Sequence, residues 1–490
     1  MQRPQLRLLS LARSGDAQAR CEVARRYLCG SHGFPRHLPS ALDHLGHPAL
    51  AGSAEAAQIV AELLPLEHIV RSGWLPALQR MAEAGLAPAR AKHGIWRRLR
   101  HGDIAATDDA DTLADALQAL ARDGLLDASA VAHLAASQAL ASGELHAAAL
   151  ALSTALTLDD AADGELAELA VRLVEAAQSG GHLPSALPPR RLAPLLEARA
   201  GQGDHVAAYA LGRALCGLPV GRLSPAALTE GNNLRKGAAL LLRAADAGCH
   251  EAWLHLYRLH AEHGSSVANP QMARFFLEKA AAQGSAEAQR RLGALLLREA
   301  SCLAATEQAL GWLHRAAAQG DGHARQLLHS LVLPLQGEAA AAEQAIAVVA
   351  ERDPWLATRL RLAREFGLTK QEALSVDPAA GERPWGLVVG RNPFIAHIRR
   401  AAPRAVPALT AAALSHLQAA AQLFRCDAAH AARHEGDLRR RAATQRRLFA
   451  QLGLDEALFF ARASSMLLDT LRLGSKWAFR ARRPLQLALA

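Results

Sequence analysis

One short phrase occurs three times in this chain at intervals of 36 residues. Its copies are Ala244–Gly248, Ala280–Gly284 and Ala316–Gly320, and each closes a helical pattern with small residues and a final glycine. The residues after each glycine open another amphipathic pattern. A fixed period of this length is typical of stacked helix-turn-helix units. Such arrays present extended surfaces to other proteins, so the period constrains both the fold and the class of function.

Local signals place the helix ends of this array. Asp204 stands where an N-cap is expected, and Ser224-Pro225 and Asn269-Pro270 each put a capping residue before proline at a first helical position. Gly212 and Gly293 fall inside helical patterns, where a missing side chain lets a neighbouring helix press close. The sequence therefore predicts successive, tightly packed helix pairs from Gly203 to Leu335.

The stretch from Lys279 to Gly293, KAAAQGSAEAQRRLG, resembles the Sel1-like repeat, a relative of the tetratricopeptide repeat. The resemblance is specific over about residues 203–330, and looser matches begin at Gly15-Asp16, Gly52-Ser53 and Gly85. It implies an α-solenoid whose concave face binds another protein or a peptide, with no chemistry of its own.

These patterns predict an all-α fold, an α-solenoid of stacked Sel1-like or tetratricopeptide-like helix-turn-helix repeats with a C-terminal helical region. The expected divisions are degenerate Sel1-like repeats at 1–100, degenerate helical repeats at 101–202, clear repeats at 203–335, terminal helices at 336–375, a Pro/Gly-rich connector at 376–407, and a basic helical region at 408–490. Within the connector, Gly386–Gly390 is the one plausible strand, and we interpret it as an extended link. Thr369 and Glu372 form a predicted capping box.

Composition agrees with a helical chain of thin layers. Hydrophobic residues make up 51% but aromatics only 4%, because alanine supplies much of the apolar count. The longest uncharged stretch, 405–424, is too polar for a membrane span. Six scattered cysteines without a CxxC pair, and no visible secretion signal, lead us to expect a cytoplasmic bacterial protein.

No catalytic or cofactor motif is found, so we expect no enzyme and no cofactor. One constellation keeps an enzymatic alternative open: Cys426, His430 and His434 share a helical face at four-residue spacing. A thiolate and two imidazoles suit zinc, but a fourth ligand is not evident. We interpret this group as a polar helix face.

The binding residues expected from the sequence are of two kinds. Aromatic side chains of the array are candidate anchors, because aromatics dominate interface energetics, although many of them are needed to fill the core. The final hundred residues hold 17 Lys+Arg against 6 Asp+Glu, which favours an alternative function: binding of nucleic acid or another anionic partner. The candidates are Tyr209, Trp253, Tyr257, Phe275 and Trp312 in the array, and Arg439, Arg440, Arg441, Arg446, Arg447, Lys476 and Trp477 in the basic region.

Overall fold

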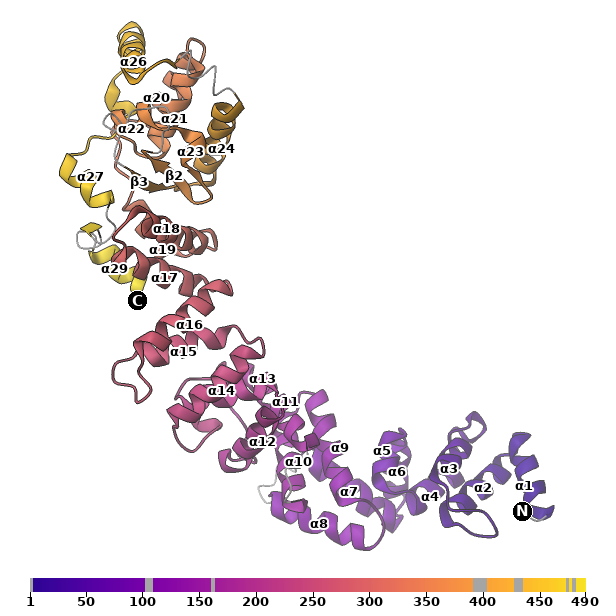
Figure 1. The fold of residues 1–490 in the computed structure, drawn as a ribbon. Helices are drawn as coiled ribbons and strands as arrows, with labels where there is room; N and C mark the ends of the chain where they lie inside the picture. Colours follow the sequence, from indigo (N-terminus) through magenta and orange to yellow (C-terminus); the bar gives the residue numbers. More distant parts are fainter. Residues whose placement is uncertain are drawn as a thin grey trace. The chain divides into compact units, whose positions relative to one another are not determined.

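The structure is a computed structural model that describes residues 3–101, 109–159, 164–390, 403–426, 435–472, 476–477 and 482–490. The chain divides into two compact units, Met1–Ala252 and Trp253–Ala490. Figure 1 shows the order of elements along the chain, and each unit is described below by itself.

The first unit is made of helices joined by short turns. Its elements are α1 (Arg3–Arg13), α2 (Ala17–Cys29), α3 (Leu38–Leu45), η1 (Pro48–Leu50), α4 (Ala54–Leu63), α5 (Leu66–Arg71), α6 (Leu75–Glu83), α7 (Ala87–His101), α8 (Ala110–Arg122), α9 (Ala128–Ala141), α10 (Leu145–Leu158), α11 (Gly164–Gly180), α12 (Pro189–Gly201), α13 (His205–Leu215), η2 (Pro225–Ala227) and α14 (Leu234–Asp246). Helix α15 (Glu251–Ala261) crosses the division between the units.

The second unit continues the helix pairs and then adds a small sheet. Its elements are α16 (Pro270–Ala282), α17 (Ala286–Glu299), α18 (Leu303–Ala318), α19 (Gly322–His329), α20 (Ala339–Ala350), α21 (Pro354–Glu365), α22 (Lys370–Ser375), α23 (Pro378–Gly381), β1 (Glu382–Arg383), β2 (Gly386–Val389), β3 (Arg404–Pro407), α24 (Ala411–Cys426), α26 (Leu438–Leu452), η4 (Glu456–Leu458), α27 (Ser465–Arg472) and α29 (Arg482–Leu489).

One turn device accounts for the repeated phrase. Gly284 and Gly320 have φ of 94° and 95°, a conformation that glycine adopts without steric cost. The next residue then caps the following helix: the Ser285 hydroxyl accepts from the Ala288 N–H at 3.3 Å, and an Asp321 carboxylate oxygen accepts from Ala324 at 2.8 Å. The same pairing occurs in the first unit at Gly15-Asp16 and Gly203-Asp204. The period of the sequence is therefore the period of a helix end followed by a helix start.

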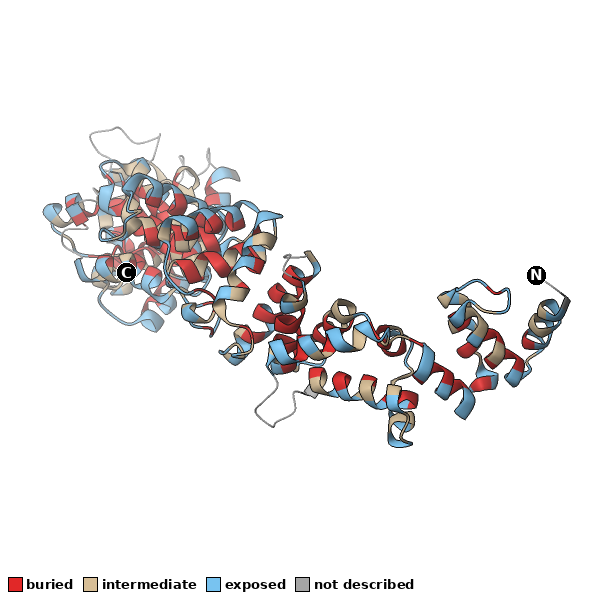
Figure 2. Ribbon diagram, turned by 90° about the horizontal axis from the view of Figure 1, so that it is seen from below, coloured by how far each residue is buried: buried red, intermediate tan, exposed pale blue. Residues whose placement is uncertain are grey.

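Glycines inside helices set how closely paired helices pack. A Cβ added to Gly293 of α17 would lie 2.7 Å from Cγ of Leu313 and 3.0 Å from the Ala309 carbonyl oxygen on α18. In the first unit, a Cβ added to Gly212 of α13 would lie 3.1 Å from Leu241 of α14. The close approach predicted at both glycines is confirmed. Figure 2 shows buried residues on the helix faces that meet neighbours and exposed residues on the opposite faces.

Two expectations about local structure need correction. Residues expected to form a connector contain α23 and an antiparallel three-stranded sheet in the order β1-β2-β3, with Leu387 opposite Val406. Every residue of β2 and β3 is buried. Ser224-Pro225 opens only the 3-10 turn η2, and α14 begins later with Asn233 as its N-cap. The first error arises because β2 becomes a strand through pairing with β3, which lies 15 or more residues away in sequence.

A buried ion pair fixes the sheet to α22. The Arg404 side chain on β3 donates to both carboxylate oxygens of Glu372 at 3.0 Å, and both side chains are at most 1% exposed. Burial alone raises the pKa of Glu372, but the Arg404 charge and hydrogen bonds to Arg404 and Thr369 leave it below its ordinary value. The Thr369–Glu372 capping box predicted from the sequence is present.

Candidate partner-binding surfaces

Two of the tryptophans expected to bind a partner are core residues. Trp253 is 7% exposed and packs against Phe276, with ring centroids 5.9 Å apart. Trp477 is 4% exposed and lies in the cluster formed with α17, α18 and α19. An aromatic-poor chain uses its large rings to fill space between alanine-lined helices, so burial removes both residues from the surface.

Three other aromatic candidates lie half-buried beneath arginine side chains. The guanidinium carbon lies 5.4 Å from the ring centroid in the Arg213–Tyr209 pair, 5.6 Å in the Arg291–Tyr257 pair and 4.7 Å in the Arg315–Trp312 pair. Tyr209 also donates to Glu251 at 2.9 Å, and burial raises its pKa to about 12. Tyr209, through Glu251, and Tyr257, through Arg291, thus join different helices, whereas the Arg315–Trp312 contact lies within α18.

Phe275 is the aromatic candidate that the structure leaves open. Its side chain is 44% exposed on α16, one turn from Met272, which is 38% exposed. The Lys279 ammonium lies 5.4 Å from the Phe275 ring centroid. The two residues form a small apolar patch beside a cation.

The predicted cationic helix face is present on α26. Arg439, Arg440, Arg446 and Arg447 are exposed, whereas Leu448 and Phe449 pack into the core. Arg441 differs, because its guanidinium donates to the Leu374 carbonyl oxygen at 3.0 Å and lies 3.5 Å from Glu435. The expected cluster is therefore an exposed row without Arg441. Lys476 is exposed.

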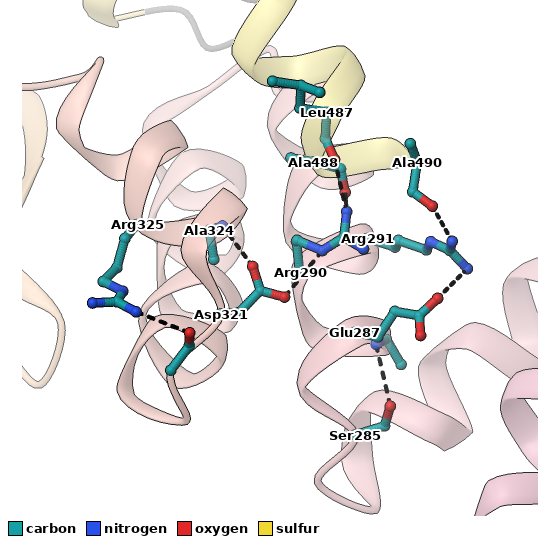
Figure 3. A network of polar contacts seen from close by, with 12 residues as sticks. Ser285, Glu287, Arg290, Arg291, Asp321, Ala324, Arg325, Leu487, Ala488 and Ala490 are labelled. Carbon is teal, nitrogen blue, oxygen red and sulfur yellow. Dashed lines mark hydrogen bonds and ion pairs between the residues drawn. The ribbon is translucent and has the colours of Figure 1, made fainter.

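Helix α29 is held against α17 and α19 by two arginines (Figure 3). Arg290 Nη1 donates to the carbonyl oxygens of Leu487 at 2.9 Å and Ala488 at 2.6 Å, while its Nε donates to Asp321 at 3.1 Å. Arg291 donates to the Ala490 carbonyl oxygen and pairs with Glu287 at 2.8 Å. Guanidinium groups at a helix C-terminus satisfy carbonyls that have no partner within the helix. This surface of the array is thus already covered by the chain itself.

A groove in the first unit was not anticipated from the sequence. It encloses about 700 Å³ between α6 and α7, with Gln138 of α9 at one side. Its charged lining consists of Arg90, Arg97 and Arg100 on α7 and Glu83 on α6, and His93 and Trp96 also face it. Burial, followed by the charge of Arg97, lowers the pKa of His93, which favours its neutral form. We call this feature the α6–α7 groove.

The sequence did hold a signal for this groove. Arg90, His93, Arg97 and Arg100 are spaced by three, four and three residues, which places them along one face of a helix. A smaller recess of about 380 Å³ lies in the second unit between α18, α19 and the start of α24. Its lining is mostly apolar, with His314, Arg325 and His329 among the polar residues, and burial lowers the pKa of His314.

The structure does not test the metal group considered at Cys426, His430 and His434. His430 and His434 lie outside the described residues, as does the side chain of Cys426. Within the described part of the chain, no group of three or more His, Cys, Asp or Glu side chains is arranged to hold a metal ion. In the same residues, no helix combines the length and apolarity needed to cross a membrane.

Comparisons with known proteins add two structural neighbours. No family model matches the chain, and no curated protein matches it. A protective antigen of uropathogenic Escherichia coli, described as displaying an SLR fold, matches with 20% identity and a TM-score of 0.30 over 66% of each chain. A Sel1 repeat protein from Oxalobacter formigenes matches with 20% identity and a TM-score of 0.28, covering 68% of this chain and 91% of the other.

The helices of this chain themselves define its class. In successive hairpins, a glycine in the left-handed conformation ends one helix, and the side chain of the next residue caps the start of the following helix. This is the construction of an α-solenoid. The prediction of an all-α solenoid of stacked helix-turn-helix repeats is confirmed by these helices.

Proposed function

We propose that this protein is a non-enzymatic scaffold or adaptor that binds another protein on the concave face of its solenoid. The observation that carries the proposal is the α6–α7 groove, because it leaves about 700 Å³ open along helices of the array. Recesses of this size accommodate side chains and short peptide segments. Phe275 and Met272 offer a second contact surface of the kind that anchors interfaces. A cytoplasmic location remains a prediction.

A steric variant tests the use of the groove without changing its charge. Gly94 lies on the helical face of α7 that lines the groove, and a Cβ added there meets no atom within 4 Å. Gly94→Phe therefore fills the groove while leaving the backbone unstrained. Gly201→Phe is the matched control, because Gly201 is exposed at the end of α12 and also has open space around it.

The measurement is quantitative co-purification of tagged chain from its native cell. We expect specific partners to bind the parent and Gly201→Phe equally and to be depleted at least tenfold from Gly94→Phe. Equal recovery with both variants would reject the groove as the binding surface. If the parent protein co-purifies with no specific partner, the proposed scaffold function is rejected.

The exposed arginine row of α26 supports a second candidate, the binding of an anionic partner. Four arginines on one helix give a strong, salt-sensitive attraction. The nucleic-acid form of this candidate gains no support from the comparisons. Binding that survives simultaneous substitution of Arg439, Arg440, Arg446 and Arg447 by glutamine would argue against it.

A further inference from the structure

We propose that the α6–α7 groove binds an acidic, extended segment of a partner protein. This inference rests on the proposed function and names the chemistry of the partner at the same site.

The first observation is an unbalanced charge. Three arginines of α7 line the groove, and the lining holds one carboxylate, Glu83. Glu83 already accepts a hydrogen bond from Gln79 at 3.0 Å. Arg90 and Arg97 are exposed, and neither makes an ion pair with a carboxylate of the described residues. Among the described residues the lining thus has an excess of positive charge, with Arg90 and Arg97 unpaired, which favours an anionic occupant.

The second observation is an incomplete hydrogen-bond set at Arg100. Its side chain is only 12% exposed, and Nη2 donates to the Ser142 hydroxyl at 3.2 Å and lies 3.3 Å from Glu144. Nη1 is buried and has no hydrogen-bond partner among the described residues. Because Arg100 lines the groove, an acceptor on a bound ligand is one way to complete this hydrogen-bond set. A carboxylate matches guanidinium geometry.

The remaining lining favours a polypeptide over a nucleic acid. Single-stranded nucleic acids bind on exposed aromatic rings, whereas Trp96 is 4% exposed and offers no face for base stacking. Gln79 and Gln138 instead provide amide groups that can pair with a peptide backbone. From Arg90 to Arg100 a helix rises about 15 Å, which an extended peptide spans in four or five residues.

Defined peptides test the proposal on the full chain. The probe is a fluorescein-labelled octapeptide with four alternating Asp or Glu residues, compared with the same peptide carrying Gln and Asn, and with a single-stranded oligonucleotide of equal charge. Fluorescence anisotropy gives the Kd in 50 and 150 mM salt. We expect the acidic peptide to bind at least tenfold tighter than the neutral one, and its binding to weaken severalfold at the higher salt.

Charge variants link that binding to the groove. Arg90→Gln and Arg97→Gln are each expected to weaken the acidic peptide five- to tenfold. Arg235→Gln, at an exposed arginine of α14, is the control and should leave Kd unchanged. Equal binding of acidic and neutral peptides, tighter binding of the oligonucleotide, or unchanged Kd in both groove variants would each overturn the proposal.

The two proposals fail in different ways. A groove that loses cellular partners in Gly94→Phe but shows no preference for acidic peptides keeps the scaffold function and refutes the acidic chemistry. If Gly94→Phe recovers the same cellular partners as the parent, the function proposed for this site is refuted, whatever the peptides show.

Discussion

At the scale of single residues, buried polar groups help to organise this chain. Lys92 of α7 is 1% exposed, and its ammonium donates to the carbonyl oxygens of Ala61 at 2.9 Å and Leu64 at 2.8 Å. These carbonyls belong to the end of α4, where helical hydrogen bonds run out. A lysine from one helix thus closes the end of another. Burial lowers the pKa of Lys92 to about 8, partly opposed by Glu67.

This lowered pKa predicts a stability that rises with pH. Above pH 8 the folded chain begins to release the Lys92 proton, while the unfolded chain keeps it until about pH 10.5. The unfolded state therefore binds more protons in this window, and the free energy of unfolding should increase by about 2 kcal/mol between pH 8 and pH 10. Urea unfolding followed by circular dichroism measures it.

The control for this prediction is a second lysine. Lys92→Met should remove the rise, whereas Lys236→Met, at a half-exposed lysine paired with Glu197, should keep it. If the free energy of unfolding changes with pH equally in the parent and in Lys92→Met, the charge of Lys92 is not the cause.

At the scale of elements, segments far apart in the sequence are joined by arginines that bind carbonyl oxygens at helix ends. Arg359, on α21, donates to the carbonyls of Ala373 at 2.9 Å and Val376 at 2.7 Å, and is also paired with Glu435. Arg290 does the same for α29. A short helix such as α22 or α29 has little stability of its own, so these bonds add to the apolar contacts that hold it in place.

Removal of the Arg290 side-chain charge should release α29. Arg290→Met leaves Asp321 without its ion pair and two carbonyls without a donor, which should cost about 2–4 kcal/mol in the second unit. Hydrogen exchange of peptides that cover residues 482–490 should accelerate at least tenfold. Arg298→Met, at an exposed arginine of the same helix, is the matched control. Unchanged protection of α29 in Arg290→Met would mean that its apolar contacts alone hold it.

At the scale of the whole molecule, the chain is a succession of local contacts. Helices pack mainly against the helices next to them in sequence, as in α9 with α10, α13 with α14 and α17 with α18. In such arrays stability is approximately a sum of repeat and nearest-neighbour terms. Damage at one hairpin should therefore remain near that hairpin.

Gly293→Ala tests this locality. The added methyl meets Leu313 and the α18 backbone, so we expect a net cost of about 1–3 kcal/mol even though alanine favours helix. Hydrogen-exchange protection should fall in α17, α18 and α19 and stay unchanged in α2 to α7. Gly311→Ala is the control, because its nearest neighbour is Trp385 at 3.6 Å, an ordinary contact. A uniform loss of protection along the chain would contradict nearest-neighbour stability.

Much of the fold could be predicted because its signals are local. In Gly284-Ser285 and Gly320-Asp321, the glycine ends one helix and the next residue caps the start of the following one. The candidate surfaces were harder to predict. Trp253 and Phe275 look alike in sequence, yet one is buried and the other exposed, because exposure depends on which neighbouring helix covers each face.

The sequence by itself determined the period, the helix ends marked by a glycine and a following capping residue, and the glycines where helices approach closely, since each depends on conformational preferences of adjacent residues. Only the tertiary structure decided the pairing of β2 with β3, the burial of Arg404 on Glu372, the docking of α29 and the opening of the α6–α7 groove. These features join residues that are far apart in the sequence, and a local sequence pattern does not specify which distant segment packs against it.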